Sequence, residues 1–193
     1  MKTNKIFSSL LTIAVIAVLL LNVSCGNKET ASTGGSPNSA VKTPKVDIHT
    51  AVLTHNIDAL KQHIAAGSDL NEKDPFGGSS PLITAALFGK QEEAKILLDA
   101  GADVDFQNND GSTALHTAAF FCRPEIVKML LEKKADKSLK NKFGATPYET
   151  VAGPFAEAKP AYDMMGQILG PMGLTLDYEH IENTRPVVAA LLK

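Results

Sequence analysis

Two stretches of this chain match each other at a fixed offset of 33 residues. The clearest matches are the triplets Ser80-Pro81-Leu82, Thr113-Ala114-Leu115 and Thr146-Pro147-Tyr148. The same spacing relates Ala85-Ala86 to Ala118-Ala119, Leu97-Leu98 to Leu130-Leu131, Ala102-Asp103 to Ala135-Asp136, and Gly78 to Gly111 and Gly144. A period of this length, with two apolar segments and a glycine-containing turn, is typical of stacked helix-turn-helix repeats. Such stacks form extended surfaces that bind other macromolecules.

One copy of the repeat begins at Gly78-Ser79-Ser80-Pro81-Leu82 and closes with Gly101-Ala102-Asp103-Val104-Asp105. The next begins at Gly111-Ser112-Thr113-Ala114-Leu115-His116 and closes with Ala135-Asp136. A more degenerate copy runs from Ile48 to Asn71. This pattern resembles the ankyrin repeat family over about residues 46–152. The resemblance implies an all-α ankyrin-repeat solenoid with β-turn or hairpin loops, and a protein as its partner.

The folded part is expected to span residues 45–193, with repeats at about 46–74, 77–109, 110–142 and 143–193. We predict helix pairs at 47–54 and 57–66, at 81–88 and 91–100, and at 114–121 and 124–133. Cys122 and Lys134 stand where the preceding repeat has Gly89 and Gly101. If the backbone there is left-handed, both residues carry a modest strain relative to glycine.

The last repeat contains an insertion. Arg185-Pro186 repeats Arg123-Pro124 at an offset of 62 residues, which places an extra segment at about 154–182 between the two helices of this repeat. Within it, helical spacing relates Phe155, Ala158, Tyr162, Met165 and Leu169, and a short helix is expected from Tyr178. We interpret the segment as an elaborated C-terminal cap over the apolar end of the solenoid. A separate binding element is the alternative.

Residues 1–24 have the composition of an export signal. Lys2 and Lys5 precede an apolar run, Ile6 to Leu21, that is shorter than a membrane-spanning helix prefers. Val23-Ser24-Cys25 resembles a bacterial lipoprotein cleavage site, although Asn22 departs from its pattern. We therefore predict lipidation of Cys25 and location in a bacterial cell envelope. The alternatives are an N-terminal anchor that is not cleaved or a soluble periplasmic protein.

Residues 25–44 are rich in Gly, Ser, Thr, Asn and Pro and are expected to form a flexible linker. After removal of the signal the chain has 17 basic and 21 acidic side chains, a net charge of −4. This balance argues against a nucleic-acid partner. With Cys25 lipidated, Cys122 has no partner for a disulfide, so core burial must stabilise the fold. We expect a monomer.

The sequence indicates no catalytic or metal site, and we expect neither enzyme activity nor a cofactor. The five histidines lack the spacing of a zinc motif. His116 matches the histidine of the ankyrin pattern and His49 its counterpart, so both are expected to make structural hydrogen bonds. A redox role for Cys122 is a minor alternative to a structural one. Glu92 and Glu93 are expected to lie on a solvated face.

The resemblance also suggests which residues bind a partner, because ankyrin repeats use hairpin tips and first helices. We predict a binding surface that contains Phe76, Phe88, Gln107, Asn109, Phe121 and Phe143. The alternative is that the aromatic rings of Phe88 and Phe121 fill the space between helices. Acidic residues at 99–110 and lysines at 133–142 predict an edge that changes from acidic to basic. The predicted function is protein binding at an envelope membrane; an inhibitor or immunity-type partner of an exported enzyme is the alternative.

Overall fold

The computed structural model describes residues 42–193, which are helical and contain no strand. The helices are α1 (Ile48–Leu53), α2 (Ile57–Ala65), α3 (Pro81–Phe88), α4 (Gln91–Asp99), α5 (Ala114–Phe120), α6 (Pro124–Glu132), α7 (Pro147–Ala152), α8 (Phe155–Leu169) and α9 (Tyr178–Leu192), with a 3-10 turn η2 (Gly170–Met172). The predicted helices of the first three repeats are confirmed to within one residue at each end. The predicted signal, Cys25 and most of the linker lie outside the described residues.

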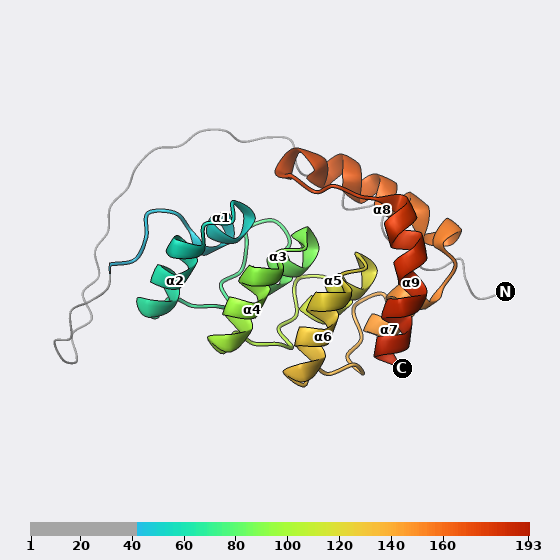
Figure 1. Cartoon of the computed structure of the whole chain (residues 1–193), viewed down its shortest axis with the longest axis horizontal. Helices are drawn as coiled ribbons and strands as arrows, with labels where there is room; N and C mark the ends of the chain where they lie inside the picture. Colours follow the sequence, from blue (N-terminus) through green and yellow to red (C-terminus); the bar gives the residue numbers. More distant parts are fainter. Residues whose placement is uncertain (1–41) are drawn as a thin grey trace. The chain divides into compact units, whose positions relative to one another are not determined.

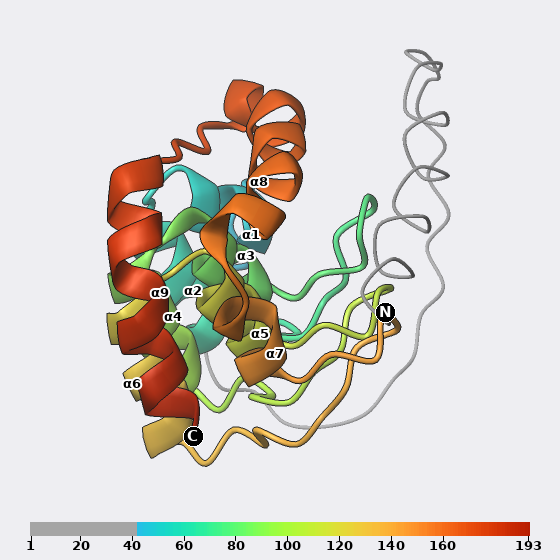
Figure 2. The same ribbon diagram turned by 90° about the vertical axis from the view of Figure 1, so that its right-hand side faces the viewer.

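The helices form two layers. Each first helix packs on the next, so α1, α3, α5 and α7 form one layer, while α2, α4 and α6 form the other (Figure 1). Helix α9 extends the second layer, because it packs on both α6 and α7. The turns that connect successive pairs project together to one side of the helices (Figure 2). This arrangement confirms the predicted all-α solenoid of helix-turn-helix units.

The first helix of each repeat begins at a residue that caps it. The hydroxyl groups of Ser80, Thr113 and Thr146 accept hydrogen bonds from backbone N–H groups three residues later, and Asp47 does the same for α1. A capping side chain satisfies a donor that the helix itself leaves unpaired, which is worth about 1 kcal/mol. Pro81 and Pro147 follow at the first helical position, where a missing N–H costs nothing.

The core lies between the two layers and between neighbouring repeats. Ala85, Ala86, Ala118 and Ala119 are fully buried, so first helices can approach closely at these small residues. Larger side chains fill the remaining space, among them Leu60, Leu82, Leu97, Leu115, Ile126 and Leu130. Burial of such a side chain stabilises the fold by about 1.5–3 kcal/mol relative to leaving it exposed.

Left-handed backbone recurs just after both the first and the second helix of a pair. Cys122 and Lys134 have φ angles of 52° and 63°, next to 67° and 88° for Gly89 and Gly101. The expected left-handed conformation at these two residues is therefore confirmed. The same conformation occurs at His55, with φ 56°, where the first repeat matches Gly89. The repeat pattern does not indicate this conformation at His55, because the first copy is degenerate.

The C-terminal cap, residues 147–192, differs from the expectation at one point. A short helix from Tyr178 and a second helix from Pro186 were expected, but α9 is continuous and Pro186 lies inside it. Asp177 caps α9 by accepting a hydrogen bond from the His180 N–H, and Ile181 is buried in the core. The N-terminal half of α9 is thus held in place, and the helix continues through the proline. No helix within residues 42–193 is both long and apolar enough to cross a membrane.

Candidate protein-binding surface

One polar side chain organises each hairpin turn through hydrogen bonds to the backbone. The Asp74 carboxylate accepts hydrogen bonds from the N–H groups of Phe76, Gly77 and Ser79 at 2.6–2.8 Å. The pKa of the Asp74 carboxyl is lower than its usual value. Burial acts to raise this pKa, but the hydrogen bonds together have the larger, opposite effect. Asn108 and Asn141 occupy the same position in the next two turns and each accepts two such hydrogen bonds.

Successive turns are also joined to one another. The Asn109 N–H donates to the Gly77 carbonyl at 3.0 Å, and the Lys142 N–H donates to the Asp110 carbonyl at 2.8 Å. The Asn109 side chain packs so closely on Gly78 that a Cβ there would lie 2.4 Å from its Oδ1 atom. Left-handed φ and this contact both require glycine at position 78. The three turns therefore form one continuous edge.

Four predicted binding residues lie on this edge. Phe76 is 85% exposed at the first tip, although its backbone is fixed by Asp74. Gln107 and Asn109 are exposed, and Phe143 is half-buried. The Gln107 side-chain amide donates to the Gly111 carbonyl at 2.8 Å, which holds it against its own turn. The structure thus brings these four residues to one side of the helices.

The two phenylalanines predicted on first helices have different environments. Phe88 is half-buried at the end of α3. Phe121 is only 5% exposed and belongs to the core, so its predicted exposure is wrong and the ring-filling alternative holds. The reason is α8, whose Tyr162 stacks on Phe120 at 4.5 Å between ring centroids and meets Phe121 edge-on at 6.3 Å. The sequence did not show that the inserted segment returns to this place.

Tyr162 and Arg185 hold the cap onto the repeats. The Tyr162 hydroxyl donates to the Phe120 carbonyl and accepts a hydrogen bond from Arg185 Nη1 at 2.9 Å. Arg185 also donates to the Gly153 carbonyl from Nη2 at 2.9 Å. Tyr162 is fully buried and Arg185 is 5% exposed. Burial raises the pKa of the Tyr162 hydroxyl above its usual range, so it remains a neutral donor.

Cys122 lies in the same junction. It is fully buried, and its thiol donates to the Ile181 carbonyl at 3.5 Å between Sγ and oxygen. Burial raises the pKa of the thiol to about 11, against the opposing effect of Arg185 and Arg123. Reactive cysteines are exposed and have a lowered pKa, so this environment favours a structural thiol over a redox-active one.

The histidines of the first helices make the expected structural contacts. His116 Nδ1 accepts from the Thr113 N–H at 3.2 Å, and Nε2 donates to the Ala145 carbonyl of the next turn at 3.1 Å. Burial lowers the pKa of His116, which keeps the ring neutral. His49 bridges the Thr84 hydroxyl and the Glu72 carbonyl. Both residues tie one repeat to the next.

The expectation for Glu93 was wrong. Glu92 is exposed as expected, but Glu93 is 1% exposed, and His55 Nδ1 lies 2.6 Å from its Oε1 atom. The next repeat has Ile126 at the matching position, so sequence comparison along the repeat could have indicated a buried place. The buried carboxylate is tolerated because His55 provides a hydrogen bond across the first junction.

The charges along the edge are partly paired. Lys95 and Lys133 both contact the Asp99 carboxylate, Lys133 at 2.9 Å, and the hydrogen bond from Lys95 is the largest cause that lowers the pKa of Asp99 to about 2. Lys134, Lys137, Lys140 and Lys142 are exposed and have no acidic partner within 4.0 Å among the described residues. The segment that carries these four lysines therefore has more unpaired charge than the site at Asp99, where the carboxylate contacts two lysines.

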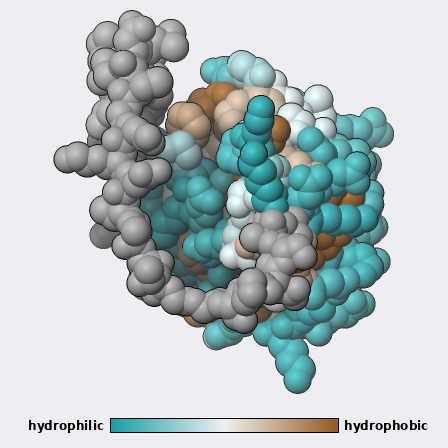
Figure 3. Space-filling model, turned by 90° about the vertical axis from the view of Figure 1, so that its left-hand side faces the viewer, coloured by the Kyte–Doolittle hydropathy of each residue, from teal (hydrophilic) through white to brown (hydrophobic). Residues whose placement is uncertain are grey.

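Two further features lie on the cap. Apolar side chains gather at the top of the face in Figure 3, and Ile168 and Met172, at the end of α8 and in η2, are 54% and 47% exposed.

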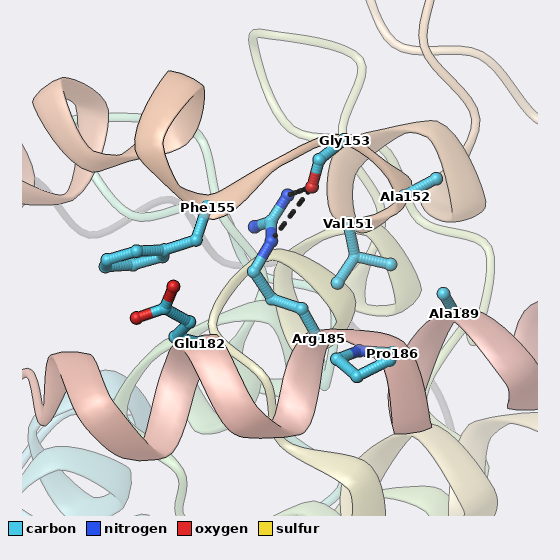
Figure 4. Close-up of a pocket in the computed structure, with 8 residues that line it drawn as sticks. All are labelled: Val151, Ala152, Gly153, Phe155, Glu182, Arg185, Pro186 and Ala189. Carbon is cyan, nitrogen blue, oxygen red and sulfur yellow. Dashed lines mark hydrogen bonds between the residues drawn. The ribbon is translucent and has the colours of Figure 1, made fainter.

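A pocket of about 210 Å³ lies between the end of α7, the start of α8 and α9, where Val151, Phe155, Glu182, Pro186 and Ala189 surround Arg185 (Figure 4). Ligand pockets for drug-sized molecules are usually larger, about 300–1,000 Å³. Residues 42–193 contain no cluster of side chains suited to a metal ion.

The helix pairs, the joined hairpin tips and the capped first helices together define a repeat scaffold of the ankyrin type. The family model for ankyrin repeats, in three copies, matches residues 48–141. Residues 48–141 are therefore ankyrin repeats, as the sequence predicted.

The relatives match only part of this chain. The human DNA-binding protein RFXANK is 38% identical over 58 residues, which is 30% of this chain and 22% of that protein. Human protein phosphatase 1 regulatory subunit 27 is 36% identical over 64 residues, 33% of this chain and 41% of that protein. The crystal structure of the ankyrin repeat domain of Bcl-3, a member of the IkappaB protein family, matches with a TM-score of 0.52 and 34% identity over 53% of this chain and 45% of that one. The chain thus spans less than half the length of these relatives.

Proposed function

We propose that this chain is a non-catalytic protein-binding ankyrin module, tethered to a bacterial envelope membrane by lipid on Cys25. The observation that carries the binding proposal is the continuous edge of joined hairpin tips, with Phe76 85% exposed at its first tip. The Phe76 backbone is fixed by the hydrogen bond to Asp74, so less backbone freedom is lost on binding. The exposed ring supplies apolar area, and aromatic residues carry much of the energy of protein interfaces.

The recognition surface is proposed to contain Phe76, Gln107, Asn109 and Phe143 on the tips and Phe88 on α3. Phe121 is left out because it is buried. The names of the relatives fit a binding role, since one is a regulatory subunit and another binds DNA. Binding to DNA is a poorer proposal here, because the whole chain has a net charge of −2.

Affinity capture from envelope membranes, followed by mass spectrometry, tests the binding surface. The full chain is expected to capture a defined protein, and Phe76→Ala should weaken capture at least fivefold without a change in the melting temperature. Val187→Ala provides the matched control, because Val187 is 53% exposed but lies on α9. Equal capture by all three chains would contradict the proposed edge. If the captured protein is an exported enzyme and capture inhibits it, the inhibitor or immunity reading is correct.

The membrane tether needs a separate experiment. The wild-type chain is expected to enter the detergent phase on phase separation, while Cys25→Ser should stay in the aqueous phase or keep its signal. Bacterial lipoproteins need several acyl chains, because one chain binds a membrane only marginally. A mature N-terminus at any residue other than Cys25, measured by mass spectrometry, would favour the uncleaved anchor or the soluble protein.

A further inference from the structure

The pocket on the cap lies against a buried positive charge. Arg185 lines the pocket between α7, α8 and α9, yet its side chain is only 5% exposed. No carboxylate among residues 42–193 lies within 4.0 Å of its guanidinium group. A charged side chain is rarely fully buried without an opposite charge, because removal from water is costly. The pocket therefore adjoins a cation that this part of the chain does not neutralise.

Arg185 also keeps hydrogen-bond donors that the fold does not use. A guanidinium group has five N–H groups. Nε and Nη2 donate to the Gly153 carbonyl at 3.3 and 2.9 Å, as Figure 4 shows, and Nη1 donates to the Tyr162 hydroxyl at 2.9 Å. One N–H group on each of Nη1 and Nη2 has no acceptor among the described residues. A carboxylate can accept from such a pair of donors and supplies the missing negative charge.

The wall of the pocket formed by α9 offers two acceptors. The Glu182 side chain is exposed at the pocket and has no basic group within 4.0 Å in the described range. Pro186 lies inside α9 and has no N–H, so the backbone carbonyl of Glu182 lacks its usual partner in a helix. Both residues line the pocket. Because one of these acceptors is a carboxylate, a cationic nitrogen on a ligand would suit them best.

The remaining walls are small and apolar. Val151, Ala152 and Ala189 line the pocket on α7 and α9, and the Phe155 side chain lines it at the start of α8. The volume of about 210 Å³ is below the range of about 300–1,000 Å³ that is usual for drug-sized ligands. The ligand that fits is therefore a small molecule with a carboxylate, a cationic nitrogen and a short apolar group.

We propose that this pocket binds a free α-amino acid with a short apolar side chain. Arg185 binds the carboxylate, Glu182 binds the ammonium group, and the small apolar residues contact the side chain. A simple carboxylic acid is disfavoured because it leaves Glu182 without a partner. The C-terminus of a peptide is disfavoured because its amide nitrogen has no charge. The inference goes beyond the proposed function and uses none of the residues proposed at the hairpin tips.

The first test is an NMR titration of the isotope-labelled full chain with L-alanine. The backbone amide signals of Gly153 and Arg185 should shift and reach saturation. Propionate, which lacks the ammonium group, should bind at least fivefold more weakly. Alanine methyl ester, which lacks the carboxylate, should not bind. The absence of a saturable shift with L-alanine would overturn the proposal, and so would a methyl ester that binds as tightly as L-alanine.

The second test fills the pocket without changing Arg185, since Arg185 also holds the cap in place. Ala152 lines the pocket and is exposed, so Ala152→Leu should fold normally and weaken L-alanine binding at least tenfold. Ala190→Leu is the matched control, because Ala190 is an exposed alanine of α9 that does not line the pocket. Its affinity should equal that of wild type. Equal affinity of the two variants would show that L-alanine binds elsewhere and would overturn the proposal.

The third test concerns the ammonium group. Glu182→Gln should weaken L-alanine binding at least fivefold, whereas Glu179→Gln, on the exposed side of α9 and outside the pocket, should have no effect. N-acetylalanine, which resembles the end of a peptide, should bind wild type at least fivefold more weakly than L-alanine does. Tighter binding of N-acetylalanine, with no effect of Glu182→Gln, would overturn the free amino acid in favour of a peptide C-terminus.

These tests are independent of the tips. Phe76→Ala should leave L-alanine binding unchanged, because Phe76 lies on a hairpin tip and does not line the pocket. If L-alanine fails to bind while Phe76-dependent capture succeeds, the pocket proposal fails and the proposed function stands. If L-alanine binds while the tips capture nothing, the tip surface fails and the pocket proposal stands.

Discussion

The middle repeats and the C-terminal cap bury their residues by different means. In α3 to α6 the stabilising contacts recur every 33 residues: a capped first helix, a buried alanine pair, and leucines between the layers. In the cap, one tyrosine and one arginine connect three elements through hydrogen bonds at positions far apart in the sequence. A repeat spreads its contacts over many residues, whereas the polar contacts of the cap centre on Tyr162 and Arg185, beside the buried Val151, Leu174, Ile181, Val188 and Leu192. The cap should therefore be the more sensitive region to a single substitution.

The largest effect is expected at Tyr162. Tyr162→Ala removes a fully buried ring and leaves Arg185 without one of its partners. We expect about 3–5 kcal/mol of lost stability from the cavity, measured by urea unfolding. Tyr162→Phe keeps the ring and should cost about 1–3 kcal/mol. Tyr178→Phe is the control, because its hydroxyl donates to the partly exposed carboxylate of Asp163, and it should change little.

Hydrogen exchange sharpens this comparison. Tyr162→Ala should increase exchange in α8 and α9 while the amides of α3 and α4 remain protected, since each repeat depends mainly on its neighbours. Uniform loss of protection across α3 to α9 would show that repeats and cap unfold as one unit.

The second-largest effect is expected where the first repeat packs on the second, at His55 and Glu93. The matching residues Gly89 and Ile126, one repeat later, provide the comparison. His55→Ala leaves the buried Glu93 carboxylate without its hydrogen bond and should cost about 1–3 kcal/mol. The double variant His55→Gly with Glu93→Ile copies Gly89 and Ile126 of the next junction. It should at least recover wild-type stability, because well-packed apolar residues often replace a buried pair without loss. A double variant less stable than His55→Ala would show that the junctions pack differently.

The same contrast explains which parts of the structure can be predicted from the sequence. Periodic positions were predictable: the helices, the left-handed Cys122 and Lys134, and the structural roles of His116 and His49 all follow from the repeat. Contacts that occur once were not. The sequence places Glu93 at the surface, because nothing in it indicates that His55 lies beside this carboxylate. It places Phe121 in the groove, because nothing in it indicates that α8 covers this ring. The exposure of Ile168 and Met172 also depends on how α8 packs on the repeats, which no local pattern specifies.

The third effect concerns left-handed backbone. Lys134→Gly removes a Cβ from an exposed residue with φ 63° and should stabilise the chain by about 1 kcal/mol. Cys122→Gly relieves similar strain at φ 52° but removes a fully buried thiol and its hydrogen bond to Ile181. The gain should therefore be smaller or reversed. Thermal unfolding of both variants checks this, and equal gains would mean that the Cys122 contacts contribute nothing.

The smallest effect is a dependence on pH at the boundary between repeats. Asp99 contacts Lys95 in its own helix and Lys133 in the next repeat, and the hydrogen bond from Lys95 is the largest cause that lowers its pKa from 3.8 to about 2. A carboxyl group whose pKa is lower in the folded state contributes stability above its unfolded pKa, and this contribution disappears as pH falls toward the folded value. The difference in melting temperature between wild type and Asp99→Asn should thus be constant above pH 5 and shrink between about pH 4 and pH 2. It should also shrink in 1 M salt, because exposed pairs are screened. A difference that persists at pH 2 would mean that Asp99 acts through packing of its side chain and not through its charge.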